Sequence, residues 1–273
     1  MLKFSFQDIK FNNHFILASH NMEIYPGELT ILCGESGSGK TTLLQELTLH
    51  QVFTKSYIYQ DIDILSLSDD EKRDFIFQHM AYVAQEPDLL EDLTIEEHIE
   101  MYQTLFSSKN NFEKYQTLLG IEQLKRQYPA QLSVGEKKRV ALLLAVLKDT
   151  DIIILDEPTN HLDMVSKEIL ENALNNYTGT IFYVSHDRYF INQTATRIIE
   201  LTNKAIVNYI GNYDYYLEKH DTVMAAIEAS VPQSADADNT VAAKVAESEV
   251  RLDWKAQKEE QARLRKKEND LKK

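Results

Sequence analysis

Apolar residues along the chain gather in short runs that are separated by longer mixed stretches. Three runs are apolar almost without interruption, at residues 29–33, 151–155 and 180–184. Such runs are typical of strands in a parallel sheet whose two faces are both covered by helices. Because stretches with helical character follow these runs, the pattern predicts an α/β domain.

The first part of the chain spreads its apolar positions over several short segments. Phe4, Phe6 and Ile9 come first, residues 15–17 follow, and a turn is expected at 26–27. Short segments bounded by turn residues predict a set of short strands. We therefore expect an N-terminal antiparallel β subdomain.

Helices are expected where a capping residue precedes a helical stretch. Ser133 is followed three residues later by Glu136, which is the pattern of a capping box, so a helix is expected from there to about Lys148. Ser68 precedes three acidic residues in a similar way. Further helices are predicted after Lys40 to about His50, over 94–120 with a break near 107–108, and over 169–174, and further strands at 56–59 and 80–84.

Composition indicates one large globular domain, or one domain and an appendage. The 273 residues are 43% hydrophobic and 26% charged, and no apolar run approaches the ~18 residues of a membrane span. The N-terminus enters a strand-like pattern directly, without the pattern of a signal peptide. Cys33 is the single cysteine, so an internal disulfide is excluded and a core-packing role is expected. These features favour a cytoplasmic protein.

Charge sets the C-terminal end apart from the rest. The net charge of −14 argues against broad binding of nucleic acid by the main body. Residues 251–273, however, carry nine Lys or Arg against five Asp or Glu, without Gly or Pro, which predicts a charged helix. Residues 225–248 show no firm periodicity and predict a linker or a loosely ordered helix. From the residues alone, a solvated tail is favoured over one that binds an acidic partner.

Residues 34–42 carry the clearest chemistry. They fit the spacing Gly-x4-Gly-Lys-[Ser/Thr] between a predicted strand and a predicted helix, as a phosphate-binding loop requires. Glycines let successive N–H groups turn around an anion, and the helix N-terminus adds partial positive charge. Lys40 is placed to reach the β- and γ-phosphates and Thr41 to ligate magnesium. The candidate nucleotide-binding residues are Gly34, Glu35, Ser36, Gly37, Ser38, Gly39, Lys40, Thr41 and Thr42.

Two carboxylates and a histidine follow the other apolar runs. Asp156 is placed to hold magnesium near Thr41, and Glu157 to polarise the water that attacks the γ-phosphate. Many buried strands end in solvated acids, so this pair alone is moderate support. His186 follows the run at 180–184, where a histidine is by itself usually structural or a surface group.

Taken together and in this order, the motifs resemble those of the ATP-binding cassette (ABC) ATPases. Residues 34–42 resemble the Walker A motif, 152–157 the Walker B strand with catalytic Glu157, and 132–136 the signature. The resemblance also implies roles for residues outside these motifs. Gln85 resembles the Q-loop glutamine, which contacts magnesium and takes part in catalysis, Asp163 resembles a residue of the D-loop, and His186 resembles the switch histidine, which senses the γ-phosphate and orients the attacking water. The residues that would contact nucleotide are Ser133, Gly135, Glu136 and Asp163. Phe11, with Phe15 second, would be the aromatic residue that stacks on adenine or else a core residue.

The resemblance implies a P-loop NTPase fold of the ABC type, with ATP and Mg2+ as cofactors. Its expected parts are an ATP-binding domain at 1–220, which includes a helical signature subdomain at about 86–150, a linker at 221–250 and a charged helical tail at 251–273. It also implies that Ser133 and Gly135 close over the γ-phosphate held by a second cassette, from a copy of the chain or from another chain. The family has two consecutive glycines here, and Val134 replaces the first, which puts the strength of closure in question.

Three interpretations of the biological role stay open. Residues 156–163, 185–191 and 211–218 closely resemble the ABC-F subfamily, whose members act mostly on ribosomes, so the tail at 251–273 would face ribosomal RNA or protein. The single cassette and residues 61–85 resemble instead the ATP-binding subunit of a membrane transporter, which would be peripheral to the membrane and bind a membrane-spanning subunit. Val134 leaves room for a cassette that binds ATP without useful turnover.

Overall fold

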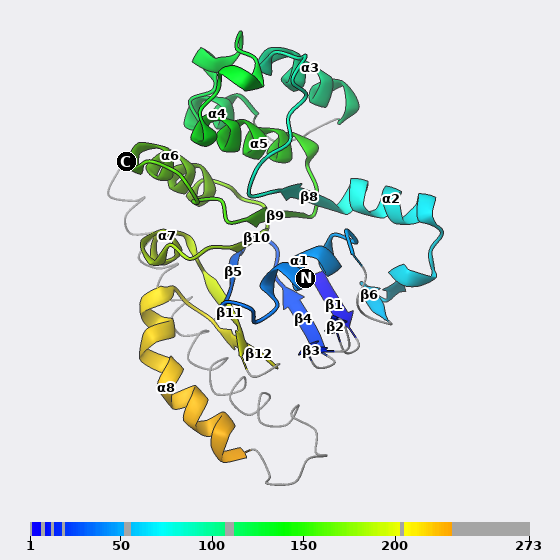
Figure 1. Ribbon diagram of the computed structural model, residues 1–273, viewed down its shortest axis with the longest axis vertical. Helices are drawn as coiled ribbons and strands as arrows, with labels where there is room; N and C mark the ends of the chain where they lie inside the picture. The colour runs from blue at the N-terminus through cyan, green and yellow to red at the C-terminus, as the bar shows by residue number, and fades with distance from the viewer. Residues whose placement is uncertain are drawn as a thin grey trace, which may run out of the picture.

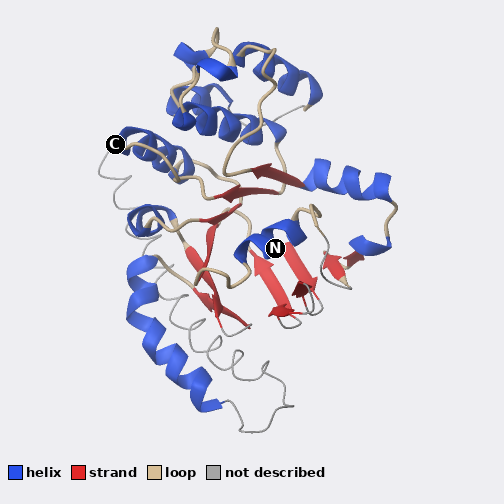
Figure 2. Cartoon of the chain, viewed as in Figure 1, coloured by secondary structure: helices blue, strands red, loops and turns tan. Residues whose placement is uncertain are grey.

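The structure is a computed structural model that describes residues 2–6, 9–11, 14–17, 20–51, 56–106, 112–202 and 205–230. A six-stranded sheet runs through its centre, a small antiparallel sheet lies on one side, and a lobe of helices lies above (Figure 1). The α/β class is confirmed (Figure 2). No helix within these ranges combines the length and the apolar character that a membrane span requires.

The central sheet has the order β12-β11-β5-β10-β9-β8. All neighbouring strands pair in parallel except β12, which is antiparallel to β11. Strands β9 and β10, which contain the apolar runs at 151–155 and 180–184, are buried on both faces, as expected for the centre of a parallel sheet. The strands are β5 (Leu29–Gly34), β8 (Met80–Val83), β9 (Ile152–Asp156), β10 (Ile181–Val184), β11 (Arg197–Thr202) and β12 (Ala205–Tyr209).

The antiparallel subdomain expected at the N-terminus is confirmed. Phe4 and Met22 pair across two strands and are buried, whereas their neighbours Lys3 and Asn21 are exposed, so the alternation of the sequence sets the two faces. The strands of this sheet, in the order β4-β1-β6-β7, are β4 (His20–Ile24), β1 (Leu2–Phe6), β6 (Tyr57–Tyr59) and β7 (Ile62–Asp63), and β2 (Ile9–Phe11) pairs with β3 (His14–Leu17) in a separate hairpin.

Helix starts follow the capping signals of the sequence. The Ser133 hydroxyl accepts the N–H of Glu136 while the Glu136 carboxylate accepts the N–H of Ser133, and the same reciprocal pairing occurs at Ser68 with Glu71. The helices are α1 (Lys40–Leu47), α2 (Asp69–His79), α3 (Ile95–Leu105), α4 (Phe112–Leu118), α5 (Val134–Lys148), α6 (Met164–Asn175), α7 (Arg188–Thr194) and α8 (Tyr213–Ser230), and three short 3-10 turns lie at Ile64–Ser66, Glu122–Leu124 and Pro129–Gln131.

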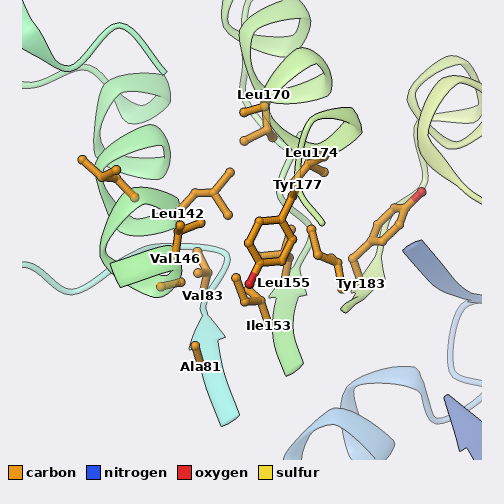
Figure 3. Packing of buried hydrophobic residues seen from close by; sticks show 14 of the residues in the cluster. Ala81, Val83, Leu142, Val146, Ile153, Leu155, Leu170, Leu174, Tyr177 and Tyr183 are labelled. Carbon is orange, nitrogen blue, oxygen red and sulfur yellow. The ribbon is translucent and has the colours of Figure 1, made fainter. Parts of the chain in front are cut away.

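The core lies on the two faces of the central sheet. On one face, α5 and α6 pack over β8 and β9, with Leu142 and Val146 near Val83 and with Tyr177 near Ile153 (Figure 3). On the other face, α1 and the antiparallel sheet pack against the same strands. Cys33 packs against the first cluster, and burial raises the pKa of its thiol to about 12, in keeping with the core role expected for it.

Several elements differ from the expectations drawn from the sequence. The first helix ends at Leu47 and not near His50, because Thr48 leaves the helical conformation and caps it. Helix α7, the hairpin β11–β12 and helix α8 were not expected. Since α8 runs to Ser230, the boundary expected at residue 220 falls inside a helix. The break expected near 107–108 and the tail at 251–273 lie outside the described residues.

Candidate active site

The candidate residues meet at one edge of the central sheet. Parallel pairing places Val184 of β10 opposite Asp156 of β9 and opposite Leu32 of β5. The segments that follow these strands therefore start side by side. They are the phosphate loop (residues 34–42), the turn that begins at Glu157, and the segment that contains His186. Ligands of open α/β sheets bind at this carboxyl edge.

The phosphate loop wraps around the ammonium group of Lys40. Its Nζ donates hydrogen bonds to the carbonyl oxygens of Gly34 (2.9 Å) and Glu35 (3.0 Å), and only 8% of the residue is exposed. Gly39 has φ 103° at the start of α1, and Gly34 has φ 146°. A Cβ on Gly34 would lie 2.6 Å from the carbonyl oxygen of Leu201, so this position has no room for a side chain.

Two buried polar atoms test whether a nucleotide fits this loop. In the described part of the chain, the hydroxyl of Ser38 and Oε2 of Glu157 are buried without a hydrogen-bond partner. Buried polar atoms are normally paired, and a phosphate oxygen or a water molecule would pair both. Thr41 is exposed in the first turn of α1, and Asp156 ends β9. The donor set therefore fits a nucleotide phosphate with a hard divalent cation such as Mg2+.

Asp156 is held by a residue that the sequence did not single out. The hydroxyl of Tyr82 on β8 donates to Oδ2 of Asp156 over 3.2 Å. Burial raises the pKa of the Asp156 carboxyl, and this hydrogen bond opposes the rise. A cation ligand in this place would favour the ionised form in the same way as Tyr82 does.

Glu157 has an unusual backbone and a perturbed carboxylate. Its φ is 45°, and its N–H donates to the carbonyl oxygen of Val184 over 3.0 Å. Burial raises the pKa of the Glu157 carboxyl, and the neighbouring His186 opposes this. Nε2 of His186 lies 3.3 Å from Oε1 of Glu157, and most of the histidine is exposed. The pair can accept a proton from a water molecule bound at this edge.

The signature residues lie at the start of α5, away from these contacts. Ser133 is exposed, and its hydroxyl is engaged with Glu136, which Ser133 also caps. Gly135 is buried within the chain, where a Cβ would lie 2.6 Å from Oγ of Ser166. Among the described residues, none of these three forms a hydrogen bond with the phosphate loop. Their proposed contact with nucleotide therefore depends on a second cassette.

The structure places three further residues of the expected site, Gln85, Asp163 and Phe11, to different extents. Gln85 follows β8 and is half-buried. Asp163 caps α6 by accepting the N–H of Ser166 over 2.6 Å, and this bond lowers the pKa of its carboxyl. Phe11 ends β2 opposite His14, but its side chain, like that of Phe15, lies outside the described part. The roles assigned to them stay predictions.

The sequence did not indicate a lysine that binds the backbone next to the candidate catalytic carboxylate. Nζ of Lys138 on α5 donates to the carbonyl oxygens of Glu157 and Asn160, each over 2.9 Å. Thr159 and Ser185 also share a hydrogen bond of 3.0 Å between the two segments that follow β9 and β10. One feature of the sequence could have pointed to Lys138. It is a charged residue on the strongly apolar helix α5, only five residues after Ser133.

The site can be compared with those of known proteins. The family model described as ABC transporter matches residues 17–160. The chain is 39% identical over 193 residues to the putative ATP-binding protein YdiF of Bacillus subtilis, covering 71% of this chain and 28% of YdiF. It is 33% identical over 214 residues to ABC transporter F family member 5 of Arabidopsis thaliana, covering 78% and 29%. It is 34% identical over 201 residues to the macrolide export ATP-binding/permease protein MacB of Pasteurella multocida, covering 70% and 31%. The chain spans less than a third of the length of these relatives.

The fold is also similar to solved cassettes. The dimeric structure of MJ0796, a bacterial ABC transporter cassette, superimposes with a TM-score of 0.62 at 25% identity. The match covers 76% of this chain and 96% of that one. The described fold therefore corresponds to nearly the whole of one cassette.

Proposed function

Because this chain belongs to the ABC transporter family and contains an ATP-binding cassette of that family, we propose that it hydrolyses ATP with Mg2+ as one half of a pair of cassettes. The observation that carries this proposal is the meeting of Lys40, Glu157 and His186 at the carboxyl edge of one sheet. We keep the expected division into an ATP-binding domain at 1–220 with a helical subdomain at about 86–150, a linker at 221–250, whose first residues belong to helix α8, and a charged helical tail at 251–273.

The proposed roles follow from the chemistry of the residues. The N–H groups of the phosphate loop and Lys40 bind the β- and γ-phosphates. Glu157 accepts a proton from the attacking water, and His186 orients that water. Thr41, Gln85 and Asp156 would hold Mg2+, which neutralises charge that develops on the phosphates.

A second cassette completes the site in this proposal. Ser133 lies at the start of α5, where the N–H groups of Val134 and Gly135 have no partner within their own helix. Such a helix end attracts an anion, and the solved MJ0796 relative is dimeric. We expect each signature to cover the nucleotide bound by the other cassette.

The experiment is size-exclusion chromatography with light scattering on the Glu157→Gln variant. With ATP and Mg2+ the variant should form a dimer, because hydrolysis is blocked and the sandwich is trapped, and with ADP it should stay a monomer. Glu157→Gln combined with Ser133→Tyr is the matched control, since it keeps the phosphate loop and obstructs the partner-facing helix end. A monomer that binds ATP would show that the second cassette comes from elsewhere.

For the biological target we propose action on the ribosome, in the cytoplasm, in the manner of the ABC-F subfamily. The similarity to an F family member supports this, as do residues 211–218 and the basic residues at 251–273. The Glu157→Gln protein should sediment with ribosomes in ATP and not in ADP. Deletion of 251–273 should weaken the association, and no association in any nucleotide would dismiss this target.

A specific similarity also favours the ATP-binding subunit of a membrane transporter. MacB is an ATP-binding/permease protein, and residues 61–85 resemble the transporter pattern. On this alternative, the protein should copurify with a membrane-spanning partner from solubilised membranes. Recovery from the soluble fraction alone, without such a partner, would count against it.

A further inference from the structure

Lys138 spans a four-residue turn next to the candidate catalytic carboxylate. We call residues 157–160 the catalytic turn. Nζ of Lys138 donates to the carbonyl oxygen at each end of this turn, in Glu157 and in Asn160, at 2.9 Å. The N–H of Asn160 closes the turn by donating to the Glu157 carbonyl over 3.2 Å. The lysine is 2% exposed, its bond to the Glu157 carbonyl is buried, and its bond to the Asn160 carbonyl is part-buried.

The catalytic turn needs such support because of its backbone conformation. Glu157 has φ 45°, a left-handed conformation that costs free energy for any residue with a Cβ. Conformations of this kind persist where the surroundings hold them in place. The contacts that do so are the two bonds from Lys138 and the bond from the Glu157 N–H to the carbonyl of Val184.

The charge of Lys138 also suits this place. Burial lowers the pKa of its ammonium group, and the negative charges of Glu157, Asp156 and Glu86 oppose that effect. Reciprocally, the lysine favours the ionised form of Asp156. A buried positive charge thus interacts with both carboxylates.

We propose that Lys138 is a positioning residue for ATP hydrolysis, which fixes the catalytic turn so that the Glu157 carboxylate faces His186, and which ties this turn to the helix that carries the signature. The inference rests on the proposed ATPase function. Lys138 lies on α5 only five residues after Ser133, and close packing of Gly135 against Ser166 fixes the same end of the helix to α6. A contact of the second cassette with Ser133 would therefore act on Glu157 through helix α5 and the hydrogen bonds that Lys138 donates.

The chain offers a matched control on the same helix. Lys148 also donates to two backbone carbonyl oxygens, of Met80 (2.6 Å) and Ile76 (3.5 Å), but at the amino end of β8, the opposite edge from the catalytic turn. Lys138→Met and Lys148→Met remove the same group from the same kind of partner. Both should lower the unfolding temperature, whereas only Lys138→Met should change catalysis.

The first measurement is steady-state ATP hydrolysis by the full chain. Lys138→Met should lower kcat by about 10- to 100-fold with KM within about threefold, because the lysine positions Glu157 and does not touch ATP. Lys138→Gln, which keeps two N–H donors, should retain a kcat between those of Lys138→Met and the wild type. Equal kcat values for Lys138→Met and Lys148→Met would overturn the proposal, as would a Gln variant no faster than Met.

The second measurement does not depend on turnover. Hydrogen–deuterium exchange of the backbone amides at 157–162 should accelerate in Lys138→Met and stay unchanged in Lys148→Met, which should instead loosen 76–81. Unchanged exchange at 157–162 in Lys138→Met would overturn the positioning role. If the wild type binds ATP but does not hydrolyse it alone, the second cassette comes from elsewhere; if it does not bind ATP, the proposed function fails. In both cases the exchange result still decides whether Lys138 holds the turn.

Discussion

Nε2 of His186 lies 3.3 Å from Oε1 of Glu157, and the two residues follow the adjacent strands β10 and β9. A water molecule between them and a phosphate could be oriented by one and deprotonated by the other. We expect His186→Ala to lower kcat by about 100-fold or more, as general acid–base groups do, and to leave ATP affinity nearly unchanged. Phosphate release and binding of a fluorescent ATP analogue measure the two quantities. Retention of more than about a third of the wild-type kcat would remove His186 from the catalytic group.

Gly34 and Gly37 separate two reasons for glycine in the phosphate loop. Both have positive φ, but a Cβ on Gly34 would lie 2.6 Å from the Leu201 carbonyl, whereas a Cβ on Gly37 would meet nothing within 4 Å. Gly37→Ala should cost only about 1–2 kcal/mol of backbone strain. Gly34→Ala should cost clearly more and should abolish ATP binding, since the loop must move. Urea unfolding and nucleotide binding give the comparison, and equal costs would show that the clash is relieved cheaply.

The sequence predicted those parts of the site that depend on local pattern. Capping at Ser133, the buried runs and the order of the motifs all follow from neighbouring residues. Strand β11 was missed because Arg197 and Glu200 interrupt its apolar run, although both are buried. Their partners come from distant segments, such as the Glu23 carbonyl for Arg197. No local rule can supply such partners.

The supporting residues of the site were missed for the same reason. Lys138 is one of three consecutive basic residues, and only the fold shows that its Nζ reaches the carbonyl oxygen of Glu157. Tyr82 lies on an edge strand, where an exposed tyrosine is ordinary, and its contact with Asp156 spans 74 positions of sequence. The role proposed for Ser133 involves a second cassette, which the pattern of this sequence does not describe.

Neutralising Glu157 should stabilise the nucleotide-free protein at neutral pH. Burial raises the pKa of this carboxyl above its unfolded value, so the native state binds more protons and stability falls as pH rises from about 4.5 through the folded pKa. Glu157→Gln removes that loss. We expect a gain of about 1 kcal/mol at pH 7.5 after screening by solvent, or about 2–4 °C in Tm, and almost none at pH 4.5.

The control for this prediction is Glu100→Gln, the same change at an exposed position in the middle of α3. Its Tm should follow that of the wild type at both pH values. Thermal unfolding in EDTA, without nucleotide, measures the two variants. If the Glu157→Gln protein is less stable than the wild type at pH 7.5, the native interactions of the ionised carboxylate outweigh the cost of burying it, and the prediction is wrong.

Helix α8 is anchored to the sheet by a buried carboxylate. Glu200 on β11 accepts hydrogen bonds from Tyr209 (3.2 Å) and from Tyr216 of α8 (2.9 Å). Tyr216→Phe leaves one carboxylate oxygen less well satisfied and should cost about 1–2 kcal/mol. Tyr189→Phe is the control, because Tyr189 is 68% exposed, and it should stay within a few tenths of a kcal/mol. Equal effects in urea unfolding would mean that the anchor contributes little.

Val134 is the departure from the family pattern whose consequence is simplest to measure. It is the first residue of α5 and is 47% exposed, so its branched side chain stands beside the N–H groups that would face the nucleotide of the second cassette. In the Glu157→Gln background, Val134→Gly should lower the concentration for ATP-dependent dimerisation by about tenfold, equivalent to about 1.4 kcal/mol. Val134→Ala, which removes the branch but keeps the stiffer backbone, should give most of this gain if bulk is the obstacle. If both variants dimerise as the valine protein does, the branched residue is tolerated, and a cassette that binds ATP without useful turnover cannot be attributed to it.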